Sequence, residues 1–150
     1  MRALAFVVGF TVIAGACGVT DPPDGFPVAW MVTSCSPVDG PAVDLYLGEV
    51  EPTDVSQPTF PHIRISVDAG AEELAGNSFS TQGVAPQIFV TQTCTDEGEC
   101  VSATGAAVEF ENNAGSTIEY SGTVYVTFSD GSSVRGRFEA YLHASLILCG

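Results

Sequence analysis

The chain has 150 residues, of which 45% are hydrophobic, and its 18 acidic side chains face only four arginines and no lysine, so the formal net charge is −14. The length predicts one domain, and the hydrophobic fraction excludes a disordered chain because it supplies apolar surface to offset the entropy of folding. The charge excludes binding to nucleic acid and to anionic lipid headgroups, since both require clustered basic side chains.

The first sixteen residues are typical of an export signal. Met1 and Arg2 precede Ala3–Ala16, an uncharged and mostly apolar run of fourteen residues. A membrane-spanning helix needs about 20 apolar residues. The run therefore predicts a cleaved signal segment rather than a membrane anchor.

The signal ends in Ala14-Gly15-Ala16, directly before Cys17. This arrangement resembles the lipobox of bacterial lipoproteins, although Ala14 stands where leucine is commonest. The resemblance implies that Cys17 receives a diacylglycerol and becomes the mature N-terminus. An Ala14-x-Ala16 sequence also suits an ordinary signal peptidase, so plain secretion is an alternative, and a retained helix is another.

The resemblance implies a location in the cell envelope, lipid-anchored and either periplasmic or surface-facing. Gly18 replaces the aspartate that resembles an inner-membrane retention signal in enteric bacteria, which favours the outer membrane in a Gram-negative organism. Residues 17–25 then form a lipid-attachment cysteine and a short tether, which Pro22-Pro23 keeps extended. Residues 26–150 form the single domain.

From Phe26 onward, short runs alternate apolar and polar residues with period two, which is typical of half-buried strands. The predicted strands cover residues 28–35, 43–47, 61–67, 87–94, 108–110, 118–128 and 134–142. Only Gly70–Gly76 has a helical composition. We expect an all-β fold, an antiparallel β-sandwich of about seven to nine strands, with a barrel as the alternative.

With Cys17 lipidated, four cysteines remain for two disulfides in an oxidising compartment. Zinc binding is the rival interpretation, but the chain has no Cys-x-x-Cys pair. Cys94 and Cys100 bracket a short polar turn that can bring them together. Cys35 then pairs with Cys149, which joins the first predicted strand to the end of the last.

No sequence motif indicates catalysis. His62 and His143 lie on the polar side of predicted strands, as surface histidines do, and neither belongs to a zinc-protease motif. Asp96, Glu97 and Glu99 cluster in the Cys94–Cys100 loop and are weak candidates for calcium ligands. No other metal or cofactor is expected.

The last two predicted strands form a hairpin around Asp130-Gly131. With a loop of Asp130, Gly131 and Ser132, Phe128 faces Val134 and Tyr125 faces Arg137. The water-facing side then carries a possible ligand-binding set, namely Tyr125, Arg135, Arg137, Tyr141 and His143. Tyrosine and arginine are enriched where surfaces bind partners.

These observations favour an envelope-anchored lipoprotein domain with a structural or ligand-binding role rather than an enzyme. Its membrane contact is the lipid on Cys17, and its partner is a protein or a saccharide. The abundant carboxylates leave a secreted carboxylate-dependent hydrolase as one alternative. A calcium- or sugar-binding module is another.

Overall fold

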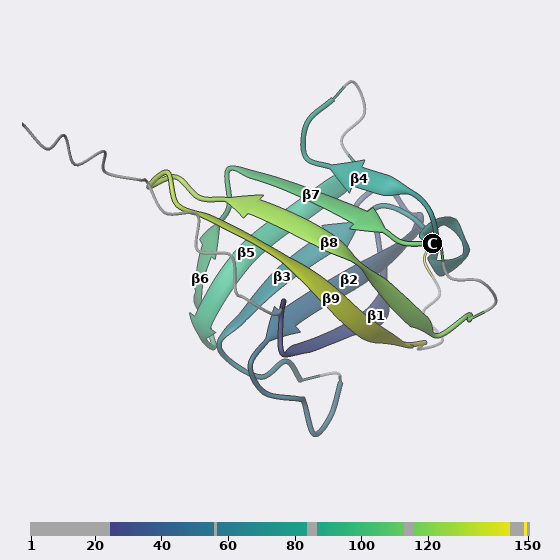
Figure 1. Ribbon diagram of the computed structural model, residues 1–150, viewed down its shortest axis with the longest axis horizontal. Helices are drawn as coiled ribbons and strands as arrows, with labels where there is room; N and C mark the ends of the chain where they lie inside the picture. The colour runs from purple at the N-terminus through teal and green to yellow at the C-terminus, as the bar shows by residue number, and fades with distance from the viewer. Residues whose placement is uncertain (1–24, 56, 84–86, 113–115, 145–148, 150) are drawn as a thin grey trace, which may run out of the picture.

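The computed structural model describes residues 25–55, 57–83, 87–112, 116–144 and 149 (Figure 1). The predicted signal segment, Cys17 and most of the tether lie outside these residues. Within the described ranges, no helix is long and apolar enough to cross a membrane.

The described residues form an all-β fold of nine strands in one sheet. The strands are β1 (Val28–Cys35), β2 (Pro41–Gly48), β3 (His62–Val67), β4 (Ser78–Ser80), β5 (Ile88–Asp96), β6 (Glu99–Ser102), β7 (Gly105–Phe110), β8 (Glu119–Thr127) and β9 (Ser133–His143). Their order across the sheet is β4-β7-β8-β9-β1-β2-β3-β5-β6. The all-β class and the strand number are confirmed.

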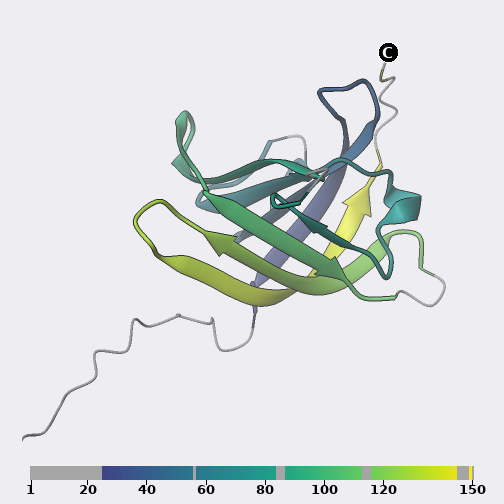
Figure 2. The ribbon, with the colours of Figure 1, turned by 90° about the horizontal axis from the view of Figure 1, so that it is seen from above.

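The antiparallel sandwich is wrong in two respects. β1 pairs in parallel with β9, so the sheet is mixed, and this pairing joins what would otherwise be two sheets into one. The single sheet curls strongly into a half-barrel, with β7, β8 and β9 facing β2, β3 and β5 across the interior (Figures 1 and 2). A curled sheet and a sandwich both bury one side of each strand, so the period-two pattern fits either.

The concave face of the sheet holds the hydrophobic core, to which both wings of the half-barrel contribute. Met31, Leu45 and Ile65 from one wing are fully buried. From the other wing, Phe110 packs edge-to-face against Phe138, with ring centres 5.6 Å apart, an arrangement that stabilises aromatic pairs beyond their burial. The core therefore lies inside the curl rather than between two sheets.

The edge strand β4 approaches the start of β5, the last strand but one on the other side of the sheet. Gln87, just before β5, donates its backbone N–H to Ser80 of β4 at 3.1 Å, and its carbonyl accepts from Asp68 at 2.7 Å. The predicted helical segment is a short 3₁₀ turn, η1 (Ala71–Glu73), and Leu74 after it is fully buried. The Tyr120 hydroxyl donates to the Ala71 carbonyl at 3.0 Å, which fixes this turn over one end of the core.

The predicted register of the β8–β9 hairpin is wrong by two positions. Tyr125 pairs with Arg135 rather than Arg137, and Val126 pairs with Val134. The loop does have three residues, but Phe128 and Ser132 flank it. Gly131 has φ of +83°, so it must be the last loop residue, where a type I turn needs the left-handed conformation.

The polar sides of β2 and β3 do not face water, contrary to the sequence prediction. Asp44, Tyr46, His62 and Ser66 are buried on the convex side of the sheet. Trp30 stacks on Tyr46 with the rings 5.1 Å apart and nearly parallel. The His62 ring contacts the rings of Tyr46 and Phe60, so the loop between β2 and β3 covers part of this side.

Both predicted disulfides are confirmed. Cys35 bonds Cys149 across 114 sequence positions, with the Cα atoms 5.6 Å apart. Cys94 and Cys100 are directly opposed in the β5–β6 hairpin, with the Cα atoms 4.1 Å apart. Disulfides of this kind are typical of an extracytoplasmic compartment.

Candidate binding face on β7, β8 and β9

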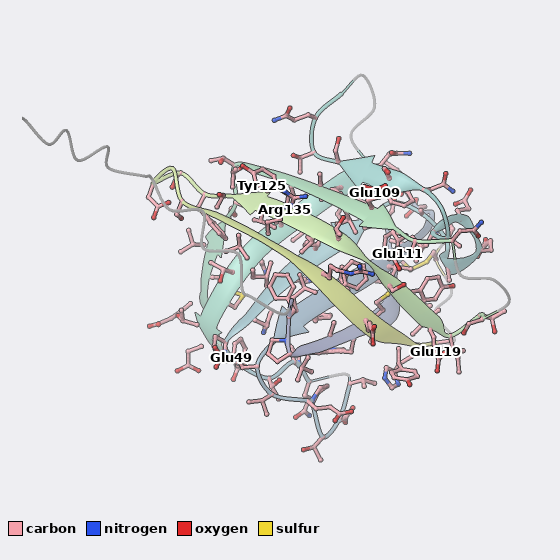
Figure 3. The ribbon with its side chains drawn as sticks, in the orientation of Figure 1. Glu49, Glu109, Glu111, Glu119, Tyr125 and Arg135 are labelled. Carbon is pink, nitrogen blue, oxygen red and sulfur yellow. A yellow bond between two sulfur atoms is a disulfide. The ribbon has the colours of Figure 1, made fainter. Side chains whose placement is uncertain are left out.

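The convex side of three neighbouring strands carries exposed aromatic and charged side chains (Figure 3). We call this surface the β7–β9 face. Its main members are Glu109, Glu119, Ser121, Thr123, Tyr125, Arg135, Arg137, Glu139, Tyr141 and His143. Successive residues of a strand point to opposite sides, so the odd-numbered residues of these strands share the convex side.

All five residues predicted for a ligand-binding set lie on this face and are exposed. Tyr125 and Tyr141 are the aromatic members, with 43% and 57% of their surface accessible. Tyr125 pairs with Arg135 near one end of the hairpin, and Tyr141 pairs with Glu119 near the other. Arg135 and Tyr141 are six positions apart along β9, so the two pairs lie about 20 Å from each other.

One arginine of the face is paired within the protein. Arg137 contacts Glu111 at 2.6 Å, and Glu111 also accepts a hydrogen bond from Ser121 at 2.8 Å. Both charged groups are well exposed, so the pair adds little to stability. Arg135 makes no ion pair with any described residue, which leaves its guanidinium available to a ligand.

Tyr141 lies in a different electrostatic setting. Its hydroxyl donates a hydrogen bond to the Glu119 carboxylate, and that bond and the negative charge raise the pKa of Tyr141. The two residues line an open depression of about 470 Å³. The other lining residues are Asn112, Ser116, Tyr120, Ser121, Glu139 and Ala140. We call it the Tyr141 depression.

A second depression, of about 510 Å³, lies beside Tyr125 and Arg135. Ser78, Ser80, Gln87, Glu109 and Thr123 supply its remaining polar side chains. We call it the Tyr125 groove. Its volume is in the range of small-molecule sites.

The sequence analysis missed the β4 side of this groove. β4 has only three residues and Gln87 precedes β5, so neither has a pattern that would place it near the final hairpin. Glu109 was findable, because it lies on the polar side of a strand whose alternation is clear. The pairing of β4 with β7, and the approach of Gln87 to β4, bring these segments together.

The candidate calcium ligands lie in the exposed β5–β6 hairpin, on the opposite edge of the sheet. The Asp96 carboxylate accepts the backbone N–H of Glu97 at 2.7 Å, which stabilises the turn. Among the described residues, no three His, Cys, Asp or Glu side chains are arranged to hold a metal ion. His143 is exposed as predicted, whereas His62 is buried.

The buried polar groups of β2 and β3 form a separate cluster. The Asp44 carboxylate contacts the Arg64 guanidinium at 2.8 Å and accepts a hydrogen bond from the Ser66 hydroxyl. Asp44 is nearly inaccessible and Arg64 is partly exposed. The Asp44 carboxylate thus has both its partners inside the protein, which indicates a structural role. Arg64 Nε is buried and has no hydrogen-bond partner among the described residues.

No family model, curated protein or solved structure matches the chain.

Proposed function

We propose that the protein is an exported, lipid-anchored module of the bacterial cell envelope that binds a partner through the β7–β9 face and has no catalytic role. The observation that carries the proposal is the set of exposed side chains on one continuous sheet surface, namely Tyr125, Tyr141 and Arg135, of which Arg135 has no ion-pair partner among the described residues. Tyrosine and arginine dominate binding energy where surfaces meet.

The two disulfides support the extracytoplasmic part of the proposal. The lipid anchor rests on the lipobox-like sequence before Cys17. Two acyl chains hold a protein on a membrane far more firmly than one. A lipidated domain would therefore stay at the membrane surface, with its tether at the start of β1.

Intact mass spectrometry of the native membrane-bound protein tests the anchor. We expect a chain that begins at Cys17 and carries a diacylglycerol adduct. Cys17→Ser should appear in the soluble fraction with an unchanged Tm, because the tether precedes the core. Wild-type protein found free of membranes with an unmodified Cys17 would contradict lipidation and leave plain secretion.

Affinity capture of envelope components by the full chain in mild detergent tests the binding face. We expect the triple variant Tyr125→Ala, Arg135→Ala, Tyr141→Ala to lose a component that the wild type retains. The control is Val38→Ala with Val50→Ala, which trims exposed apolar residues away from the face. Equal capture by the wild type and the triple variant would contradict the proposal.

One observation favours a second candidate, the carboxylate-dependent hydrolase. Glu119 and Glu139 both line the Tyr141 depression. Glycoside hydrolysis uses two carboxylates on opposite sides of one bond. Chromogenic glycosides and esters test this activity. A hydrolase would lose turnover in both Glu119→Gln and Glu139→Gln and keep it in Glu111→Gln, whereas the binding module gives no turnover in the wild type.

A further inference from the structure

The Tyr125 groove contains the chemical groups that recognise a sugar ring. On two adjacent strands, Tyr125 and Arg135 face each other directly, and Ala107 of β7 faces Tyr125 from the other side. Alanine is small, so its position next to a half-exposed tyrosine leaves open space beside the ring. β4 bounds the far side of that space, where Ser80 faces Ala107.

The polar groups around this space offer both donors and acceptors. Glu109, two residues beyond Ala107 on the same side of β7, faces Ser78 of β4 and Thr123 of β8. The side chains of Glu109 and Arg135 make no hydrogen bond or ion pair with described residues. Gln87 is held at the β4 edge by the bond from its N–H to Ser80. It supplies an amide, which both donates and accepts.

We propose that the Tyr125 groove binds a neutral saccharide, one pyranose ring lying against the Tyr125 side chain. This inference rests on the proposed function and names the ligand class. A pyranose has C–H faces, which suit the electron-rich face of an aromatic ring. Its rim of hydroxyls pairs with the arginine, carboxylate, amide and hydroxyl groups around the groove.

The charges favour a neutral ligand over an acidic one. The groove holds one cation, Arg135, and one carboxylate, Glu109, and neither is paired with a residue that the structure describes. An anionic sugar would satisfy the arginine but would be repelled by the glutamate and by the net charge of −14. Neighbouring hydroxyls of a neutral sugar satisfy both groups at once.

The groove is open to solvent, so the affinity for a single ring should be weak, in the millimolar range. Nuclear magnetic resonance titration of the full chain in detergent is suited to this range. The probes are tetrasaccharides of β-1,4-linked glucose, xylose and N-acetylglucosamine, together with tetragalacturonate as the acidic counterpart. We expect at least one neutral tetrasaccharide to bind and to shift resonances of Tyr125, Thr123 and Arg135.

Four variants separate the site from general effects on the face. Tyr125→Ala removes the ring and Ala107→Leu fills the space beside it, and each should weaken binding at least about tenfold. Tyr125→Phe keeps the ring and should bind as the wild type does. Val101→Ala trims an exposed apolar side chain of β6, outside the β7–β9 face, and should also leave binding unchanged.

The outcomes separate this inference from the proposed function. Binding of tetragalacturonate alone, abolished in Arg135→Gln, would overturn the neutral class. Saccharide binding that survives both Tyr125→Ala and Ala107→Leu would overturn the site. If no saccharide binds while capture of an envelope component still depends on the β7–β9 face, the inference fails and the proposed function stands. If neither is observed, both fail.

Discussion

Asp44 and Arg64 illustrate how burial sets the value of an ion pair. The Asp44 carboxylate is nearly inaccessible and holds both Arg64 and Ser66. Asp44→Ala would leave both partners without their acceptor in a poorly hydrated setting. We expect a loss of about 3 kcal/mol in the free energy of unfolding, measured by urea denaturation.

The exposed pair Arg137–Glu111 is the matched control, since its geometry is as close but both partners face water. Glu111→Ala should cost less than about 1 kcal/mol. Equal losses in the two variants would show that the Asp44 cluster is well hydrated and that its burial does not strengthen the pair.

His62 should make the stability depend on pH. Burial lowers the pKa of His62 below its ordinary value of 6.5, and the charge of Arg64 acts in the same direction. The hydrogen bond from its ring to the Thr59 carbonyl, at 2.8 Å, opposes them. Below about pH 6.5 the unfolded chain binds the proton more readily than the folded one, so stability falls as the pH falls towards the folded pKa.

Urea denaturation at several pH values between 7.5 and 5 measures this effect. The wild type should lose stability more steeply over this range than His62→Gln, whose side chain stays neutral. A wild-type slope equal to that of His62→Gln would show that folding does not lower the pKa of His62.

At this scale the sequence predicted which side of β8 and β9 is exposed, and it failed on β2 and β3. Tyr125, Arg135 and Tyr141 could be placed because a strand alternates sides and their apolar neighbours fill one of them. Tyr46 and His62 show the same alternation, yet aromatic rings from β1 and from the loop before β3 cover them. Cover from distant segments leaves no trace in local periodicity.

At the scale of a strand, Gly122 of β8 lies where a side chain would meet both β7 and β9. A Cβ there would run into the backbone carbonyl of Glu109 and lie 2.9 Å from the Phe138 ring. A carbonyl in a sheet ladder cannot move aside easily, so Gly122→Ala should cost about 1–3 kcal/mol. Thermal denaturation monitored by circular dichroism measures the loss as a lower Tm.

Gly40→Ala is the control, because a Cβ at that position would lie 3.9 Å or further from its nearest neighbouring atoms. Its Tm should stay close to that of the wild type. If the Tm of Gly122→Ala equalled that of Gly40→Ala, β7 and β8 would be able to separate at little cost in free energy, contrary to the close contact at Gly122.

The strands differ in how far their sequences predict them. β1 was predicted with its observed bounds, because turn residues flank an apolar run. β4 and β6 were not predicted, since β4 has only three residues and β6 is exposed throughout. The hairpin loop length was right and its position was wrong, because the prediction put Gly131 in the middle of the loop, whereas its positive φ suits the last place.

At the scale of the whole molecule, the two disulfides should contribute unequally. Cys35–Cys149 closes a loop of over a hundred residues, and Cys94–Cys100 closes a loop of a few. In the chain-entropy model a loop of about 100 residues contributes about 4.7 kcal/mol, and a much shorter one less than about 3. The double variant Cys35→Ala, Cys149→Ala should therefore have the lower Tm.

The double variant Cys94→Ala, Cys100→Ala is the comparison, and reducing the wild type should reproduce the loss of both bonds. The reverse order of Tm values would mean that the Cys94–Cys100 hairpin stabilises the folded state directly. Constraint of the unfolded chain would then not be the main contribution.

The overall shape could not be predicted from the sequence because it depends on the pairing of β1 with β9. The strands were expected to divide into two sheets, but β1 accepts β9 as a neighbour, and the sheet continues across both wings. Nothing in the residues of β1 or β9 distinguishes a partner in the same sheet from one in an opposing sheet. Twist then curls the continuous sheet around its own core.

The pairing of β1 with β9 also sets the order in which the protein can fold. β1 is synthesised long before β9, as the separation of 114 positions between Cys35 and Cys149 indicates. Until β9 arrives, β1 has β2 on one side and an open edge on the other, and such edges pair readily with other chains. A chain that stops before Ser133 would therefore tend to aggregate, and the docking of β9 ends that hazard.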